Sequence, residues 1–139
     1  MMKLRRIIYT SKATKELSKR NLLDLLHEAR AFNKMDNITG VLIYKQGCFL
    51  QVLEGKTKVI DNLIERLIRD SRHKNFKIIQ DNFIKNRLFK DWKMGCADFD
   101  DPTLIFIPGI STDFSGLKVI NELIIHLPEI AIFLQDKTH

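Results

Sequence analysis

Four segments of the chain carry apolar side chains that would face both sides of a sheet, and this pattern constrains the fold more than any other. The segments contain Ile7 and Ile8, Leu42 and Ile43, residues 50–53, and Ile78 and Ile79. Successive residues of a β-strand point to opposite faces of its sheet. Strands of this kind therefore need cover on both faces, and one layer of helices does not provide it.

The order of the predicted elements gives an α+β fold. Strands are predicted over residues 4–11, 38–44, 48–53 and 76–84, with a short fifth strand over 92–97. A first helix is predicted over residues 19–33, because Ser18 is a favourable N-cap and apolar residues follow at helical spacing. The stripe of a second helix consists of Val59, Ile60, Leu63, Ile64, Leu67 and Ile68. This order is ferredoxin-like, βαββαβ with an extra strand, and its two helices cover one face of the sheet.

The C-terminal part, residues 98–139, is expected to cover the other face as a helical cap on the domain of residues 1–97. Two apolar sets have helical spacing and are separated by Pro128: Leu117, Ile120, Leu123, Ile124 and Leu127 before it, and Ile130, Phe133 and Leu134 after it. We predict two short C-terminal helices. Further apolar residues lie outside this stripe and leave surface for oligomer or partner contacts: Val119, Ile125 and Ile132.

Composition favours one intracellular domain. The 139 residues are 45% hydrophobic, which is enough for one core. Cys48 and Cys96 form no CxxC motif and no zinc-ligand set with the histidines, which favours a reducing compartment. No apolar run approaches the roughly 18 residues of a membrane span. We therefore expect a cytoplasmic protein without a membrane segment.

The formal net charge of +6 raises the question of nucleic-acid binding. The basic surplus lies in residues 1–101, where it is spread over predicted helix surfaces and turns. Without a compact basic stripe interleaved with aromatic residues, a solvated surface is favoured. A nucleic-acid-binding module of ferredoxin-like topology stays an alternative. An acylphosphatase-like hydrolase is a weaker one, because residues 11–15 after the first strand contain no glycine for an anion-binding loop.

Gln51 is the most informative polar residue, because it lies in the middle of a strand that is apolar on both faces. An unsatisfied buried amide costs roughly 1–3 kcal/mol, so a polar partner is expected. If the first and third strands are neighbours, alternation places Tyr9 on the same face as Gln51. The two side chains then either satisfy each other or form part of a binding site.

Five further residues are candidates, each with a structural alternative. Asn33 is either a site residue or the C-cap of the first helix. Arg72 and His73 either bind an anionic group or complement the dipole at the end of the second helix. Trp92 and Met94 lie on one face of the predicted fifth strand, either in the core or against a cofactor. The chain shows no Ser/His/Asp arrangement, HExxH, P-loop or GxGxxG, so no catalytic constellation is predicted.

Taken together, these segments resemble the BLUF family, the sensors of blue light using FAD. The matching segments follow the family's order: RIIYTS at 6–11, Asn33, ITGVL at 38–42, FLQVLEG at 49–55, DSRH at 70–73 and FKDWKMG at 89–95. They cover about residues 4–97. The ITG and FLQVLEG pieces in combination are highly specific. Residues from 98 onward carry no comparable motif.

The resemblance implies a flavin bound non-covalently between the two helices on the sheet, with FAD expected and FMN or riboflavin possible. Tyr9 then gives an electron and a proton to the flavin on excitation, and Gln51 rearranges its hydrogen bonds. A red-shifted state results that reverts in the dark. Asn33 matches the asparagine that binds the flavin ring, and Arg72 and His73 fall near the flavin side chain.

The resemblance also implies an output. Trp92 and Met94 match the fifth-strand pair that is linked to signalling, and the signal is expected to pass to a partner protein in trans, with no enzyme activity in this chain. A homo-oligomer is expected. Two residues depart from the family's pattern: Phe32 stands where a polar residue is common, and Cys96 has no functional account.

Overall fold

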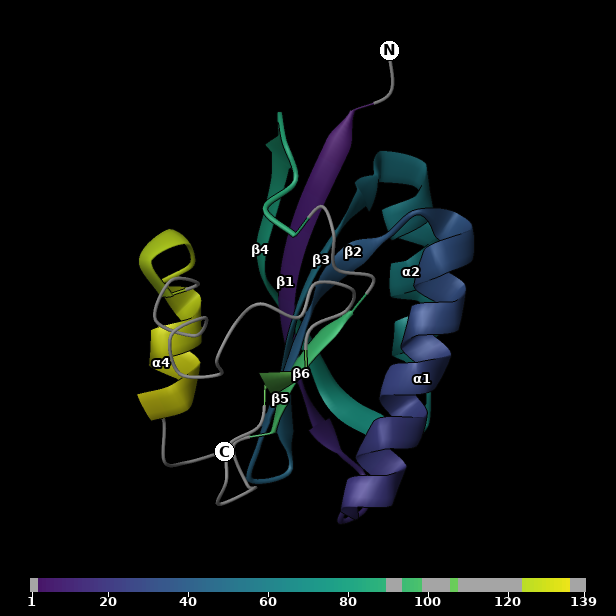
Figure 1. The fold of residues 1–139 in the computed structure, drawn as a ribbon, viewed down its shortest axis with the longest axis vertical. Coiled ribbons are helices and arrows are strands. Elements are labelled where there is room, and N and C mark those ends of the chain that lie inside the picture. The colour runs from purple at the N-terminus through teal and green to yellow at the C-terminus, as the bar shows by residue number, and fades with distance from the viewer. Residues whose placement is uncertain (1–2, 90–93, 99–105, 108–123, 136–139) are drawn as a thin grey trace.

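A six-stranded sheet forms the centre of the computed structural model, which describes residues 3–89, 94–98, 106–107 and 124–135 (Figure 1). Its strands are β1 (Leu4–Ala13), β2 (Thr39–Lys45), β3 (Cys48–Lys56), β4 (His73–Ile84), β5 (Gly95–Asp98) and β6 (Phe106–Ile107). The helices are α1 (Lys19–Asp36), α2 (Thr57–Arg69) and α4 (Glu129–Gln135). The strand order is β4-β1-β3-β2-β5-β6. The predicted α+β, ferredoxin-like fold is confirmed, and β6 is an element that the sequence pattern did not predict.

Local sequence signals explain where these elements begin and end. Ser18 caps α1 in a capping box with Asn21, in which each side chain accepts a hydrogen bond from the other residue's backbone N–H. At the other end Asn37 adopts the left-handed conformation that ends a helix. The β2–β3 hairpin turns through Gln46 and Gly47, both with positive φ, as its two-residue loop requires.

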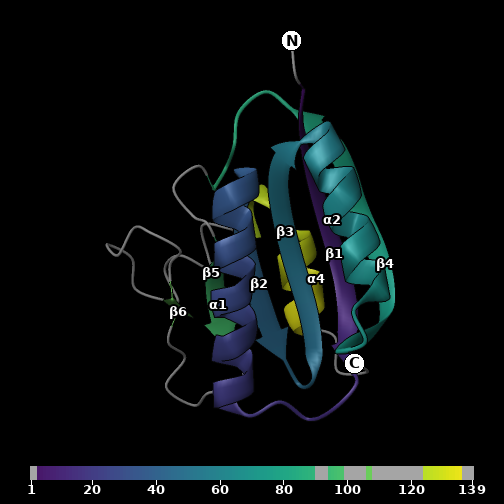
Figure 2. The ribbon, with the colours of Figure 1, turned by 90° about the vertical axis from the view of Figure 1, so that its right-hand side faces the viewer.

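The two faces of the sheet carry separate apolar clusters, as the two-sided strands predict. On one face α1 and α2 lie side by side (Figure 2) and pack on a cluster that includes Ile7, Leu42, Leu53, Leu26 and Ile60. On the opposite face lies a cluster of Ile8, Val41, Ile43, Leu50, Val52, Leu127, Ile130 and Phe133. The last three of these residues come from α4 and the turn before it, so the expected cover of the second face is present.

The C-terminal cap contains the predicted break. Residues 124–126 are helical, the helix is interrupted at 127–128, and α4 begins at Glu129. Gln80 Nε2 donates a hydrogen bond to Glu129 Oε1 over 3.0 Å, which ties α4 to β4. Ile125 and Ile132 are 78% and 68% exposed, as expected for residues outside the stripe. Leu117, Val119, Ile120 and Leu123 lie outside the described residues.

The expectation of apolar cover on both faces is wrong for β4. This strand is at the edge of the sheet, where Ile78 and Ile79 are more than one third exposed and Phe83 is mostly exposed. Near this edge, Arg5 forms ion pairs with Asp61 of α2 and Asp81 of β4, so charged groups lie where apolar packing was expected. Ile68 is also 61% exposed, which places it outside the buried stripe of α2.

A fully buried carboxylate, Glu54 of β3, fixes the chain after β4. Its oxygens accept hydrogen bonds from Arg6 Nε at 2.9 Å, the Leu88 N–H at 3.0 Å and the Phe89 N–H at 2.8 Å. The Arg87 guanidinium donates to the Glu54 carbonyl at 2.9 Å. The chain is thereby held on β3 a few residues before Met94.

Within the described residues, no helix is both long and apolar enough to span a membrane.

Candidate functional site

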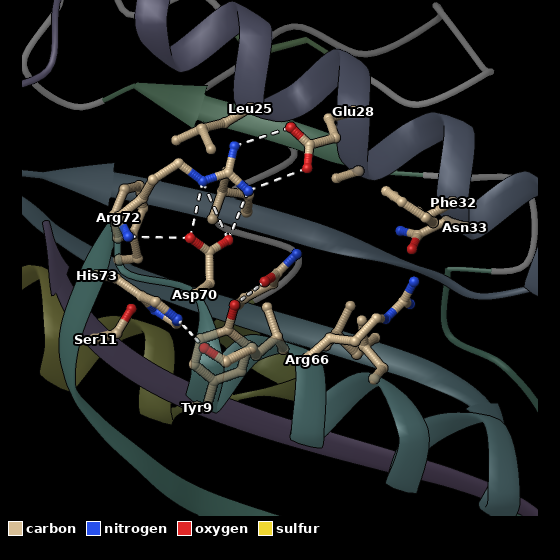
Figure 3. A pocket seen from close by; sticks show the side chains of 17 residues that line it. Tyr9, Ser11, Leu25, Glu28, Phe32, Asn33, Arg66, Asp70, Arg72 and His73 are labelled. Atoms are coloured by element: carbon tan, nitrogen blue, oxygen red, sulfur yellow. Dashed lines mark hydrogen bonds and ion pairs between the residues drawn. The ribbon is translucent and has the colours of Figure 1, made fainter.

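A pocket of about 240 Å³ lies between α1, α2 and the strands β1 and β3, and it opens to solvent (Figure 3). Five predicted site residues line it: Tyr9, Asn33, Gln51, Arg72 and His73. The remaining lining residues include apolar side chains from both helices and the sheet, together with Ser11, Glu28, Arg66 and Asp70. Segments far apart in the sequence therefore meet at one site.

Tyr9 and Gln51 are in direct contact, as alternation on neighbouring strands predicts. The antiparallel register of β1 and β3 pairs the two residues, and the Tyr9 hydroxyl donates a hydrogen bond to Gln51 Oε1. Gln51 Nε2 in turn donates to Met94 Sδ over 3.3 Å. All three side chains are buried. They form one hydrogen-bonded series that runs from the pocket to the residue before β5.

The environment of Tyr9 keeps its hydroxyl protonated. The ring packs on Phe76 with 4.6 Å between the ring centroids, and 3% of the residue is exposed. Burial raises the pKa of Tyr9 above its ordinary value, and the negative charge of Asp70 raises it further. Tyr9 is therefore a neutral hydrogen-bond donor at neutral pH.

Asn33 is a pocket residue and not the helix C-cap. Helix α1 continues to Asp36 and is capped by Asn37, so Asn33 lies in its last full turn. Its side chain faces the pocket, and 2% of the residue is exposed. The C-cap alternative is therefore wrong. The helix runs three residues beyond the predicted end because Lys34, Met35 and Asp36 are all compatible with a solvated helical turn.

Arg72 bridges the two sides of the pocket. Its guanidinium pairs with Glu28 of α1 at 2.9 Å and with Asp70, at the end of α2, at 2.6 Å, as Figure 3 shows. The hydrogen bonds from Arg72 lower the pKa of Asp70, although burial acts in the opposite direction. The cation is thus already neutralised by two carboxylates, so the alternative in which Arg72 only complements the dipole at the end of α2 is incomplete.

His73 shows features of both interpretations. One ring nitrogen lies within hydrogen-bond distance of the Leu67 carbonyl in the last turn of α2, which is the helix-end contact. The residue also lines the pocket, with its ring 6.3 Å from that of Tyr9 between centroids. Trp92 lies outside the described residues. Met94 precedes β5, so the strand begins later than the predicted residue 92.

Several pocket residues were not singled out from the sequence. Ser11 shares a face of β1 with Tyr9, and strand alternation alone could have found it. Glu28 and Arg66 carry no local signal, because charged residues on helices are usually solvated. Arg66 lies over the ring of Phe32 at 4.6 Å from its centroid, so this departure from the family's pattern forms part of the pocket rim.

Known proteins resemble this chain in sequence and in fold. Photoactivated adenylate cyclase subunit alpha of Euglena gracilis is 29% identical over 102 residues, which are 72% of this chain and 10% of that protein. The chain in the structure of the BlsA ground state has 34% sequence identity to this chain and a TM-score of 0.64. The match covers 68% of this chain and 64% of that one. The dark-state structure of BlrB, a BLUF protein, has a TM-score of 0.71 over 96% of this chain and 93% of that one, at 22% identity, and shows the fold alone.

The match to the Euglena relatives concerns a small part of those proteins. This chain spans about a tenth of the length of the curated relatives it matches. A family model described as sensors of blue-light using FAD matches residues 4–95. Since that match covers well over half of the chain, the chain belongs to the BLUF family, whose members sense blue light with a flavin.

Proposed function

We propose that this chain holds a flavin between α1, α2 and the sheet, and that Tyr9, Gln51 and Met94 convert the absorption of blue light into a structural change. The observation that carries the proposal is the series of side-chain hydrogen bonds from Tyr9 through Gln51 to Met94. The series is buried. Its groups are neutral, so its hydrogen bonds can rearrange without moving a net charge through the core.

The residues around the pocket fit a flavin. Apolar walls suit the faces of a flat ring and come from Leu25, Leu42, Phe49, Leu53, Leu63 and Leu67. The amides of Asn33 and Gln51 offer donors and acceptors for the carbonyl and nitrogen atoms of its edge. The buried Ser11 hydroxyl has no hydrogen-bond partner among the described residues. A ligand atom at Ser11 would remove a cost of about 1–3 kcal/mol.

A bound flavin would supply the light absorption and would accept both an electron and a proton. Tyr9 would give the flavin that electron together with its phenolic proton, which the raised pKa holds at the hydroxyl until then. When the proton leaves, Gln51 Oε1 loses its donor. The Gln51 amide then turns, which breaks its Nε2 bond to Met94 Sδ. The segment that contains Trp92 and Met94, and β5 after it, transmits this change.

FAD is the flavin that we propose, with FMN and riboflavin as the alternatives, and Arg72 and His73 are proposed to lie near its side chain. The signal passes to a partner protein in the cytoplasm, and the chain itself acts as a sensor without catalysing a reaction. The exposed Ile125 and Ile132 on the outer side of the cap support an oligomer or partner contact there. Nucleic-acid binding through the β1–β3 face is disfavoured, because Leu127, Ile130 and Phe133 cover that face.

Absorption spectra before and after blue light test this function. The purified chain, loaded with FAD if necessary, is expected to be yellow and to shift its flavin band to the red reversibly. If the chain binds none of FAD, FMN and riboflavin when they are added, the proposal is refuted. Pull-downs under light and in the dark then identify the partner.

A further inference from the structure

A second polar contact reaches Met94, and it comes from α1. Arg30 Nε donates a hydrogen bond to the Met94 carbonyl oxygen over 2.9 Å. Arg30 does not line the pocket, whereas Ala29 and Asn33 on the same helix do. The contact therefore joins the helix of the proposed flavin site to the backbone of the residue whose side chain receives the Gln51 hydrogen bond.

The place of Met94 in the chain makes this contact important. Pairing of β5 with β2 begins at Gly95, opposite Val41, so Met94 lies just before the paired part of the strand. Its side chain is fully buried. The sulfur must lie close to Gln51 for the 3.3 Å contact to form. A hydrogen bond to the Met94 carbonyl restricts the backbone on which that distance depends.

The guanidinium of Arg30 is partly withdrawn from water to make this contact. Burial lowers the pKa of Arg30, and the nearby Cys96 partly offsets this effect. Taking a cation out of water costs free energy unless it is well hydrogen-bonded. A hydrogen bond from a charged donor is stronger than one between neutral groups, so this contact favours one backbone arrangement for Met94.

We propose that Arg30 is a positioning residue for Met94: by holding the Met94 carbonyl against α1, it keeps the thioether where Gln51 Nε2 can donate to it. This inference rests on the proposed function. Loss of this hydrogen bond leaves the Tyr9–Gln51 pair in place, because Arg30 donates to the Met94 carbonyl whereas Tyr9 donates to Gln51. The loss instead slows the dark recovery, during which the hydrogen bond from Gln51 to Met94 must form again.

Arg30→Met tests this role, because it keeps the stem and removes the donor. We expect the light-induced red shift to keep its amplitude and the dark recovery to become at least three times slower. Arg30→Lys retains a cationic donor and should restore most of the recovery rate. Arg20→Met is the matched control on α1, where Arg20 is largely exposed and pairs with Asp24. Flavin affinity and Tm are measured for every variant to account for a general loss of stability.

A double variant separates positioning from a merely structural effect. In a Met94→Leu background the sulfur acceptor is gone, so Arg30→Met should slow recovery no further. Recovery of Arg30→Met that is unchanged or faster than in the unsubstituted chain would overturn the proposal, as would additive effects in the double variant. A chain that binds flavin and shows no red shift would instead refute the proposed function.

Discussion

The Tyr9 hydroxyl donates to Gln51 Oε1, and the opposite end of the same amide donates to Met94 Sδ. Gln51 is thus an acceptor toward β1 and a donor toward β5. A carboxylate could not do both, because it has no donor when ionised. A rotation of the amide group by half a turn exchanges the positions of its donor and its acceptor. This geometry is why we propose Gln51 as the residue whose two arrangements distinguish the dark state from the lit state.

Removing either polar group of the first contact should abolish the photoresponse and leave binding intact. Tyr9→Phe removes the proposed electron and proton donor, and Gln51→Ala removes the amide that we propose to rotate. We expect a red shift below about a tenth of the normal amplitude in both, and flavin affinity within about tenfold, since one hydrogen bond contributes roughly 0.5–1.5 kcal/mol. Tyr44→Phe is the control, because Tyr44 is a buried tyrosine that does not line the pocket. A normal photocycle in Tyr9→Phe or Gln51→Ala would contradict these assignments.

Gly40 is required by a close backbone approach within the sheet. A Cβ added there would lie 1.9 Å from the carbonyl oxygen of Val52 on β3. Gly40→Ala must therefore separate β2 from β3 next to Gln51, at a cost of about 1–3 kcal/mol or more. Urea denaturation measures it.

Gly55→Ala provides the control for this substitution. Its Cβ would meet Ile38 and Ile60 at 3.4 Å, an ordinary contact distance. We expect little change in the free energy of unfolding for Gly55→Ala. Equal losses in the two variants would show that the steric account of Gly40 is wrong.

The cap on the second face can be tested with two neighbouring isoleucines of α4. Ile130 is fully buried in the cluster with Ile8 and Leu50, whereas Ile132 is 68% exposed. Ile130→Ala should cost about 2–5 kcal/mol, and Ile132→Ala less than about 0.5 kcal/mol. Thermal and urea unfolding would measure both. A small cost for Ile130→Ala would mean that α4 does not stabilise the domain.

The central strands could be predicted from the sequence because their residue patterns are compatible with only one kind of element. Two-sided apolar strands required two layers of cover, and both are present. Alternation along β1 and β3 also predicted the Tyr9–Gln51 contact, and the register of the two strands confirms it. Periodicity failed at β4, since the same apolar content occurs in a buried strand and in an edge strand. Position in the sheet, which depends on distant pairing, decides between them.

The charged residues of the candidate site were harder to predict from the sequence. Glu28 and Arg72 are 44 positions apart, and their ion pair exists because α1 and the end of α2 face each other across the pocket. Arg30 likewise contacts a carbonyl 64 positions away. Such contacts leave no trace in local spacing. Asn33 was ambiguous for a related reason, because the end of α1 is set by Asn37 in the left-handed conformation.

The raised pKa of Tyr9 predicts how stability changes in alkali. Tyr9 stays neutral in the folded chain at pH values where a tyrosine of the unfolded chain, with a pKa of about 10, has ionised. The unfolded state then binds fewer protons than the folded state. The stabilisation is therefore fully present below about pH 10 and is lost as the pH rises above it, by up to about 1.4 kcal/mol per pH unit.

Denaturation of the unsubstituted chain and of Tyr9→Phe at about pH 8 and about pH 11 measures this effect, since those values lie on either side of the ordinary tyrosine pKa. Phenylalanine cannot ionise, so the variant should lose less free energy of unfolding between the two pH values. All other residues are the same in the two proteins, so their contributions cancel in the comparison. Identical losses in the two proteins would mean that Tyr9 ionises in the folded chain as readily as in the unfolded one. The hydroxyl would then not be held as the neutral donor that its contact with Gln51 requires.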